Sequence, residues 1–306
     1  MKNFDVIGFG ALNVDEIYKV DRIISAEEES IISDHVESCG GSAANTTVGL
    51  ARLGCKTGFI GKVADDKDGK MLLESFDQED IDVNGITVSK QGKSGRVVGL
   101  VDKKGERALY VNAGVNDTIR YEEINSEYAF GTKILHLTSF VGQISFRTQM
   151  QLIERLPEDV KISFDPGALY AKIGLASLEP IIQRTFVLLP SVNELETLTG
   201  KSDYETGAQV LLEKGTKLIA VKLGADGCYV TDGTRKWLIE AFKVKIVDTT
   251  GAGDAFNAGF LYGLISGQSA FLCGKIGNFV ASRCITQLGA RVGLPTQEDL
   301  VEHKII

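Results

Sequence analysis

Apolar runs alternate with amphipathic stretches along most of the chain. An apolar run at residues 4–10 ends in glycines, and residues 42–53 show a helical pattern that closes at Gly54. Further strand-type runs, several followed by helical stretches, lie at 57–63, 134–138 into 147–155, 162–165, 186–189 into 193–199, and 218–222. This alternation predicts an α/β fold with a mostly parallel central sheet and helices on both of its faces.

Two segments break this rhythm and predict a second, smaller sheet. Residues 95–111 alternate on both sides of the turn at 102–105, as a hairpin with a glycine in its turn does. Residues 15–36 contain short β-type runs around three consecutive glutamates. We predict that approximately residues 15–36 and 94–112 form a small β lid over the carboxyl edge of the large sheet, within one catalytic domain that spans residues 1–306.

Composition and charge narrow the classes of function. The chain has 306 residues, of which 43% are hydrophobic and 24% charged, so we expect a substantial core without long disordered tracts. Acidic residues outnumber basic ones 41 to 33 and no Lys/Arg block appears, so nucleic acid is not an expected partner. The five cysteines and three histidines lack the spacing of a metal site. Because Asp5 interrupts the region of a secretory signal, and no run reaches the roughly 18 apolar residues of a membrane span, we expect a cytoplasmic protein without membrane contact.

The strongest chemical motif is the run Asp-Thr-Thr-Gly-Ala-Gly-Asp at residues 248–254. The alternating stretch 243–247 predicts a strand before it, and an apolar helix is predicted after it. The N–H groups of residues 251–254 would then point outward at a helix start and form a cradle for phosphate. Asp254 would lie in the first helical turn, where the helix dipole favours its ionised form and it could accept the proton of an attacking hydroxyl. The alternative is a tight glycine turn followed by an ordinary first-turn acid.

This run resembles the C-terminal signature of the ribokinase (PfkB-type carbohydrate kinase) family. A second segment, Gly40-Gly-Ser-Ala-Ala-Asn45 and onward to Gly54, is similar to the N-terminal signature of that family. The resemblance extends from Gly8 to about Pro295 with the motifs in order. It implies a ribokinase-like three-layer α/β/α sandwich and a kinase that uses ATP and Mg²⁺. It also implies that Asp254 is the catalytic base, with the N–H groups of Gly251, Ala252 and Gly253 stabilising negative charge.

The resemblance assigns further residues to binding. The residues implied for the acceptor are Asn13, Asp15, Gly40, Gly41, Ser42 and Asn45. The residues implied for the nucleotide are Asn193, Lys222, Gly224, Gly227, Thr249 and Asn278. Glu196 is implied for Mg²⁺ through water, and Asp248, Thr250, Cys284 and Gly289 for a monovalent cation such as K⁺.

Simpler explanations stand beside three of these assignments. Asp15 could cap a turn, and the spacings 191–194 and 193–196 both fit capping boxes at a helix start. Lys222 stands where the family usually has a hydroxyl residue. The loop 289–293 departs from commoner members of the family after its Gly-Ala pair.

The acceptor stays open between several compounds. A small sugar is our first hypothesis, phosphorylated by ATP on a hydroxymethyl group. A nucleoside kinase of the adenosine, cytidine or inosine type is the alternative, with Phe140 or Tyr110 as a wall for the base. A sugar phosphate would need the lid residues Arg96 and Arg107 as converging cations.

Two further hypotheses concern the chain as a whole. A catalytically silent sugar- or nucleotide-sensing protein on the same fold is a third functional candidate. The exposed strand edges of the lid predict a homodimer in which two lids meet.

Overall fold

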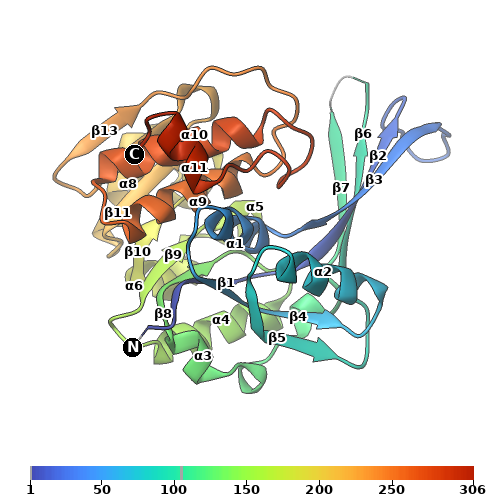
Figure 1. Ribbon diagram of the computed structural model, residues 1–306, viewed down its shortest axis with the longest axis horizontal. Helices are drawn as coiled ribbons and strands as arrows, with labels where there is room; N and C mark the ends of the chain where they lie inside the picture. The colour runs from blue at the N-terminus through green and yellow to red at the C-terminus, as the bar shows by residue number, and fades with distance from the viewer. Residues whose placement is uncertain (1, 104–105) are drawn as a thin grey trace.

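The computed structural model describes residues 2–103 and 106–306, with the side chain of Arg107 also left out. The predicted 102–105 turn therefore lies partly outside the described residues. A nine-stranded sheet crosses the molecule in the order β13-β12-β11-β10-β9-β8-β1-β4-β5 (Figure 1). The strands from β11 to β5 in that order run parallel, and β12 and β13 extend the sheet antiparallel at one edge. The strands are β1 Phe4–Phe9, β4 Thr57–Ala64, β5 Asp82–Ser89, β8 Thr132–Leu137, β9 Lys161–Phe164, β10 Thr185–Leu188, β11 Leu218–Lys222, β12 Cys228–Thr231 and β13 Lys236–Ile239.

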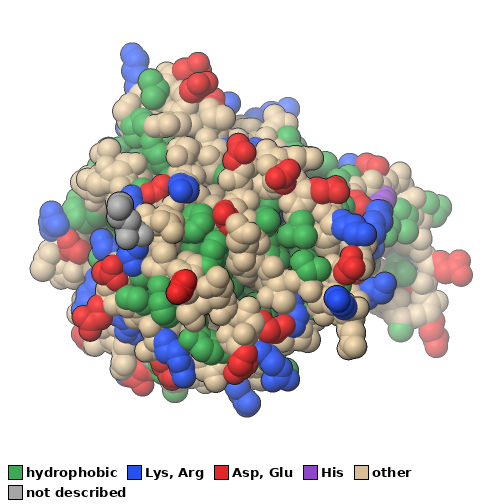
Figure 2. Space-filling view, turned by 60° about the horizontal axis from the view of Figure 1, so that its bottom comes forward, with side chains coloured by type: hydrophobic (Ala, Val, Ile, Leu, Met, Phe, Trp, Pro, Cys, Tyr) green, Lys and Arg blue, Asp and Glu red, His purple; other side chains and the backbone are tan. Residues whose placement is uncertain are grey.

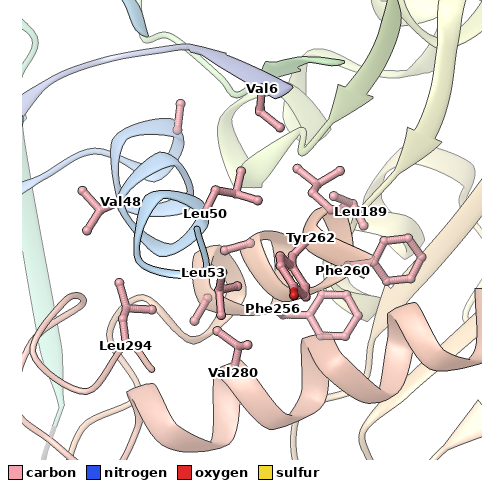
Figure 3. Packing of buried hydrophobic residues seen from close by; sticks show 14 of the residues in the cluster. Val6, Val48, Leu50, Leu53, Leu189, Phe256, Phe260, Tyr262, Val280 and Leu294 are labelled. Carbon is pink, nitrogen blue, oxygen red and sulfur yellow. The ribbon is translucent and has the colours of Figure 1, made fainter. Parts of the chain in front are cut away.

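Strand alternation divides the core into two layers. On β11, Leu218 and Ala220 join one buried cluster while Ile219 and Val221 join the other, because successive side chains of a strand point to opposite faces. Figure 3 shows the first cluster, where Leu50, Leu53 and Val280 lie near the aromatic rings of α9. The helices on this face are α1 Ser42–Arg52, α2 Lys67–Asp77, α9 Ala252–Ile265, α10 Ala270–Cys284 and α11 Gln297–Glu302. The helices on the other face are α3 Ser126–Phe130, α4 Gln143–Arg155, α5 Gly167–Ile173, α6 Leu175–Arg184, α7 Val192–Thr199 and α8 Tyr204–Glu213.

Short 3-10 helices complete the connections: η1 Gly114–Thr118, η2 Tyr121–Glu123 and η3 Gly224–Asp226. The predicted three-layer α/β/α arrangement with a mostly parallel sheet is confirmed. No helix formed by the described residues is long and apolar enough to cross a membrane. On the face shown in Figure 2, basic and acidic side chains are interspersed and gather into no patch of one sign.

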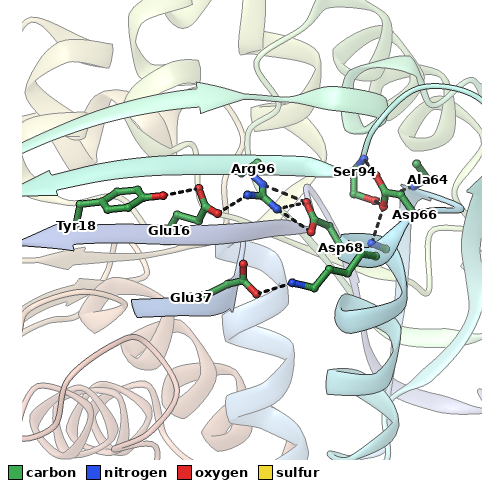
Figure 4. A network of polar contacts seen from close by, with 10 residues as sticks. Glu16, Tyr18, Glu37, Ala64, Asp66, Asp68, Ser94 and Arg96 are labelled. Atoms are coloured by element: carbon green, nitrogen blue, oxygen red, sulfur yellow. Dashed lines mark hydrogen bonds and ion pairs between the residues drawn. The ribbon is translucent and has the colours of Figure 1, made fainter. Parts of the chain in front are cut away.

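A second sheet, in the order β3-β2-β6-β7, projects from the main body (Figure 1). Its strands are β2 Asn13–Val20, β3 Ile32–Gly40, β6 Gly95–Val101 and β7 Arg107–Asn112. We call this four-stranded sheet the lid sheet. Arg96 on β6 pairs with Glu16 on β2 and with Asp68 on α2, with Nη2 2.7 Å from Asp68 Oδ2 (Figure 4). This network fastens the lid sheet to the helix beneath it.

Two predicted elements differ from the structure. Residues 243–247 form no strand, so that prediction is wrong. After β13 the chain leaves the sheet, and the N–H of Val247 donates to the Ile285 carbonyl at 2.9 Å, in the loop after α10. Helix α4 begins at Gln143, before the predicted 147. In its first turn Gln143 and Ile144 are exposed, and the buried residue is the polar Ser145, whose Oγ donates to the Asn116 carbonyl at 2.7 Å. The apolar face of the helix therefore becomes visible in the sequence only after this turn.

Candidate active site

Asp254 lies in the first turn of α9, directly after a glycine turn. Gly251 adopts a left-handed backbone with φ of 76°, and a Cβ there would lie 2.7 Å from the Cα of Ala290. Only glycine therefore fits between the two segments. The N–H of Ala252 donates to the Thr249 carbonyl at 3.2 Å. This group is therefore already bonded, and fewer N–H groups than predicted remain to bind a phosphate. The N–H groups of Gly253 and Asp254 remain as candidate donors to an anion, because the first N–H groups of a helix have no partner within it.

Helix α1 supplies two neutral donors to the Asp254 carboxylate. Ser42 Oγ donates to Oδ1 at 2.6 Å, and Asn45 Nδ2 donates to Oδ2 at 2.9 Å. Burial raises the pKa of Asp254 to about 6, although these two hydrogen bonds lower it. The carboxylate is thus held in one orientation while it keeps the ability to take up a proton near neutral pH.

The predicted acceptor residues converge beside Asp254 where the lid sheet joins α1. Gly41 has φ of 105°, and a Cβ on it would lie 2.2 Å from the Ala11 carbonyl oxygen. A Cβ on Gly40 would lie 2.0 Å from Asp15 Oδ2, so the Gly-Gly pair lets this carboxylate approach the main chain. Burial raises the pKa of Asp15 to about 6, while Arg291 acts to lower it and the nearby Asp254 acts to raise it. Asn13 accepts a hydrogen bond through Oδ1 from Asn116 Nδ2 at 3.0 Å.

A cavity of about 140 Å³ opens between the start of α1, the lid sheet and the loop after β8. The residues that line it are Ala11, Asn13, Gly41, Ser42, Val97, Val111, Ala113, Asn116, Asp117, Thr138, Ser139, Val141 and Leu169. Ser42 belongs to this lining and also donates to Asp254, so the cavity adjoins the carboxylate.

Neither aromatic residue proposed as a wall for a nucleoside base lines this cavity. Val97 and Val111 are cross-strand partners that face it, and the neighbouring pair, Val98 and Tyr110, therefore faces the opposite side of the lid sheet. Tyr110 is 64% exposed, and Phe140 is 2% exposed with its ring 5.6 Å from that of Phe9. The prediction that Phe140 or Tyr110 forms an aromatic wall for a base in this cavity is therefore wrong.

A buried ionic network contacts α9 at Asn257, one turn after Asp254. Lys222 Nζ contacts Asp165 Oδ2 at 2.7 Å, and Asn257 Nδ2 donates to the same oxygen at 2.6 Å. Burial acts to raise the pKa of Asp165, but Lys222 and the hydrogen bonds outweigh it and the pKa is lowered. Burial acts to lower the pKa of Lys222, but Asp165 and Glu194 outweigh it and the pKa is raised. A Cβ on Gly253 would lie 3.4 Å from Lys222 Nζ, so this ammonium group stands beside the glycine turn.

Of the other predicted nucleotide residues, the glycines and Asn278 have clear local roles. Gly224 begins η3 and Gly227 ends it, with φ of 63° and 90°. Asn278 Nδ2 donates to the Ile239 and Glu240 carbonyls at 2.9 and 3.1 Å. Asn278 therefore fixes the segment after β13, and its Oδ1 remains as the acceptor that could face a base.

The α7 residues show which capping box forms. Ser191 and Glu194 make the reciprocal bonds of a capping box, whereas Asn193 and Glu196 point into solvent. Lys222 donates its N–H to the Pro190 carbonyl at 2.8 Å, which places the start of α7 next to the end of β11. An exposed carboxylate such as Glu196 suits Mg²⁺ held through water.

The four residues predicted around a monovalent cation come together. Gly289 N–H donates to Asp248 Oδ2 at 2.9 Å, and the Thr250 hydroxyl donates to Asp248 Oδ1 at 2.7 Å. The Cys284 thiol lies 3.7 Å from the Thr250 carbonyl and 3.4 Å from that of Ala290. The carboxylate and carbonyl oxygens gathered there are the donor type that such a cation requires.

Several residues at the site were missed by sequence reasoning. They are Thr46, Asn116, Asp117, Asp165, Glu194, Asn257 and Arg291. Asp165 carried a usable signal, because a carboxylate at the carboxyl end of a buried strand stands where α/β folds bind ligands. Of the two lid arginines considered for a phosphate, Arg96 is occupied by Glu16 and Asp68, and the side chain of Arg107 lies outside the described residues.

Comparison with known proteins agrees with the geometry. A sequence profile described as pfkB family carbohydrate kinase matches residues 3–297. The chain is 44% identical over 255 residues to an uncharacterised sugar kinase of Archaeoglobus fulgidus, covering 82% of this chain and 100% of that protein. It is 33% identical over 256 residues to an ATP-dependent ribose-1-phosphate kinase of Halopiger xanaduensis, covering 84% of this chain and 83% of that protein.

The fold has a close structural counterpart. The ribokinase of Thermotoga maritima superposes with a TM-score of 0.87 at 28% sequence identity, covering 98% of both chains. Its likeness extends over the large sheet and the lid sheet together, so the ribokinase-like fold predicted from the sequence is confirmed.

Proposed function

Since this chain belongs to the pfkB family of carbohydrate kinases, we propose that it transfers the γ-phosphoryl group of ATP to a hydroxymethyl group of a small sugar. One observation carries the proposal. The Asp254 carboxylate is held by Ser42 and Asn45 beside a cavity, at the N-terminus of a helix. A hydroxyl that enters this cavity would meet a base on one side and an anion-binding helix start on the other.

For phosphoryl transfer the protein mainly has to position the two substrates and stabilise the negative charge on the phosphate oxygens. Asp254 accepts the proton of the acceptor hydroxyl as its oxygen attacks the γ-phosphorus in line with the leaving β-phosphate. The N–H groups of Gly253 and Asp254 donate to the transferring oxygens, where negative charge gathers. Mg²⁺, when bound near Glu196, neutralises charge on the phosphates of ATP.

Lys222 is the cation of this chain that we assign to the phosphate side. It stands beside Gly253, and its contact with Asp165 holds it there before ATP binds. An ammonium group at this point would offset the charge of the leaving phosphates. The hydroxyl residue usual in the family supplies a hydrogen bond at this position, whereas Lys222 supplies a full positive charge.

The cavity favours a neutral acceptor. Asp15, Asp117 and Asp254 lie in or beside it, and none of the described residues that line it is a lysine or an arginine. Carboxylates accept hydrogen bonds from vicinal hydroxyls of a sugar but repel an anionic group. The absence of an aromatic residue from the described lining also makes a nucleoside the weaker candidate.

A pentose 1-phosphate is the second candidate acceptor. The relative from Halopiger xanaduensis, named as a ribose-1-phosphate kinase, is 33% identical to this chain. Such an acceptor presents the same hydroxymethyl group to Asp254, and its phosphate would have to lie on the lid side of the cavity. The neutral-sugar hypothesis rests on the uncharged and acidic lining of the cavity, and the pentose 1-phosphate hypothesis rests on the name of the relative. An assay must decide between them.

The deciding experiment is an ATP-consumption assay with Mg²⁺ against pentoses, hexoses, pentose 1-phosphates and nucleosides. The proposal predicts turnover with at least one free sugar and none with nucleosides. Turnover confined to pentose 1-phosphates would replace the neutral sugar by the second candidate. Silence across the panel, together with a ligand-induced rise in unfolding temperature, would favour a sensing protein. Repeating the active reaction in K⁺ and in a large organic cation tests whether Asp248 and its neighbours hold a monovalent ion.

The lid sheet also supports the proposal of a homodimer. Its edge strands β3 and β7 expose large apolar side chains, with Ile32 55%, Leu109 56% and Tyr110 64% exposed. Exposed apolar edge strands commonly pair with another chain. Sedimentation at micromolar concentration is expected to give a dimer, and a monomer there would refute this part of the proposal.

A further inference from the structure

Arg291 places a guanidinium group beneath the candidate active site. It lies in the loop after α10, within the 289–293 segment that departs from commoner family members. Its Nε donates to Asn45 Oδ1 at 2.8 Å, and its Nη atoms lie 3.4 Å from Ser75 Oγ and 3.5 Å from the Gly40 carbonyl oxygen. Its guanidinium carbon lies 5.9 Å from the centre of the Phe76 ring. The group is thus flanked by α1, α2 and the end of β3, and Arg291 as a whole is half-buried.

This charge lacks a close counter-ion. No carboxylate of a described residue lies within 4.0 Å of its nitrogens. Burial lowers the pKa of Arg291, although Asp15 and Glu79 at longer range raise it. A half-buried cation without a direct ion pair loses part of its hydration, so a hydrophobic side chain would pack here at least as well if packing were its only task.

Asn45 connects this guanidinium to Asp254. Its Oδ1 accepts from Arg291 Nε, while its Nδ2 donates to Asp254 Oδ2 at 2.9 Å. Arginine is a donor only and an ionised carboxylate is an acceptor only, so just one orientation of the amide satisfies both. A reversed amide would set two donors against each other at Arg291 and an oxygen against the carboxylate at Asp254.

We propose that Arg291 is a positioning residue for the catalytic base, fixing the Asn45 amide with its NH₂ group toward Asp254. The inference rests on the proposed kinase function. With Ser42 on Oδ1 and Asn45 on Oδ2, the carboxylate is fixed in rotation and presents its remaining lone pairs to the acceptor cavity. Without Arg291 only Asp254 itself orients the amide, so the Asn45–Asp254 hydrogen bond is held less firmly and the base loses this donor for part of the time.

A bracing role for the loop is the competing explanation, and the chain offers a matched control for it. Arg52 donates through Nη1 to the Arg291 carbonyl at 2.6 Å and pairs with Glu79 at 2.6 Å. It therefore supports the main chain of the same loop with the same chemical group, but it makes no contact with Asn45. A purely structural need would make the two arginines similarly sensitive.

The test is a double-mutant cycle on the holoenzyme with ATP, Mg²⁺ and the best acceptor of the panel. The variants are R291M, N45A and R291M/N45A, with R52M and R52M/N45A as controls. Loss of a hydrogen bond that orients a charged group predicts a fall in kcat of about 10- to 100-fold for R291M, with the KM for ATP unchanged. In the N45A background, R291M is expected to add less than about 2-fold, because its effect passes through Asn45. R52M is expected to have the same effect in both backgrounds.

The opposite results would overturn the inference. They are an R291M effect of equal size with and without Asn45, or an R291M effect no larger than that of R52M. R291Q keeps a neutral donor for Asn45 Oδ1 and decides the matter if R291M is too unstable to assay. R291Q is expected to retain most of the wild-type kcat, and a loss as large as that of N45A would count against the proposal. An inactive wild-type chain would refute the kinase function instead, so the two failures are distinguishable.

Discussion

Asp254 on α9 and Asp165, which accepts a hydrogen bond from Asn257 of the same helix, are two carboxylates whose partners differ in kind. Asp254 is held by neutral donors, Ser42 and Asn45, and its pKa rises to about 6. Asp165 is held by a cation, Lys222, and its pKa is lowered. Neutral donors orient a carboxylate and leave it able to bind a proton, whereas a buried ammonium group keeps it ionised. In the proposed mechanism this difference separates the base from a counter-ion before any substrate is bound.

The largest effect is expected from removing the base. Asp254→Asn should lower kcat by about 10²- to 10⁴-fold, because the acceptor hydroxyl loses its proton acceptor. The KM for ATP should hardly change. An asparagine can still bond to Ser42 and Asn45, so we expect an unfolding temperature at pH 7.5 equal to or above that of the wild type. Steady-state kinetics and thermal unfolding check both halves, and turnover near that of the wild type would remove Asp254 from the role of base.

The same substitution at Asp165 should instead cost stability. Asp165→Asn leaves Lys222 buried without its counter-ion, and breaking such a pair costs about 3–5 kcal/mol of unfolding free energy. Urea unfolding at pH 7.5 measures the change. Asp34→Asn is the control, because the Asp34–Lys19 pair is exposed and its loss should leave the urea midpoint unchanged. If Asp165→Asn proved as stable as that control, the two carboxylates would not differ in the way described.

The pH dependence should also separate the two carboxylates. The base must be ionised, so kcat/KM for the acceptor should rise with pH up to about 6 and then level. Asp15, whose pKa is also raised to about 6, titrates over the same pH range as Asp254. A profile that stays flat down to pH 4.5 would contradict a base with a raised pKa.

For stability the signs are opposite. The raised pKa of Asp254 gives a contribution that is complete below the unfolded value of 3.8 and is lost as pH rises through about 6. The lowered pKa of Asp165 gives a contribution that is present above 3.8 and is lost as pH falls. The difference in unfolding free energy between Asp254→Asn and the wild type should therefore be smaller at pH 4.5 than at pH 7.5.

The smallest effect is expected from a single donor. Ser42→Ala removes one hydrogen bond that lowers the pKa of Asp254, so the acid limb of the kcat/KM profile should move to higher pH. Thr46→Val is the control, because the Thr46 hydroxyl reaches only the main-chain carbonyl of Asp254, at 3.2 Å. Its profile should match that of the wild type. Equal shifts in both variants would mean that the fold of the α9 start, and not the side-chain donor, sets the pKa.

The chain pattern predicted the central sheet well because buried parallel strands are short, nearly continuous apolar runs. It failed at 243–247, where alternation is present but no neighbouring strand is available, since β13 already ends the sheet. Periodicity describes which faces are apolar and does not tell whether a partner strand exists. The late prediction of α4 has a different origin, because Gln143 and Ile144 are exposed and the buried Ser145 is polar, so the first turn shows no apolar face.

The candidate site was predictable where one local motif contains several of its residues. The glycine turn before Asp254 and the Gly40–Gly41 segment are of this kind. Asp165 and Arg291 were missed because each acts through partners far away in sequence, 57 residues to Lys222 and 246 residues to Asn45. Contacts at such separations depend on the completed fold, so only the unusual loop at 289–293 hinted at Arg291.

The lid sheet has a consequence for how this enzyme could change its substrate in evolution. Val97 and Val111 face the candidate acceptor cavity from β6 and β7, whereas the proposed base, its donors and the proposed phosphate-side cation all lie in other segments of the chain. Substitutions at this valine pair would reshape the cavity while leaving the transfer chemistry in place. Evolution could thus change the acceptor specificity through substitutions in one hairpin. A small library of variants at Val97 and Val111, screened against different acceptors, would test this.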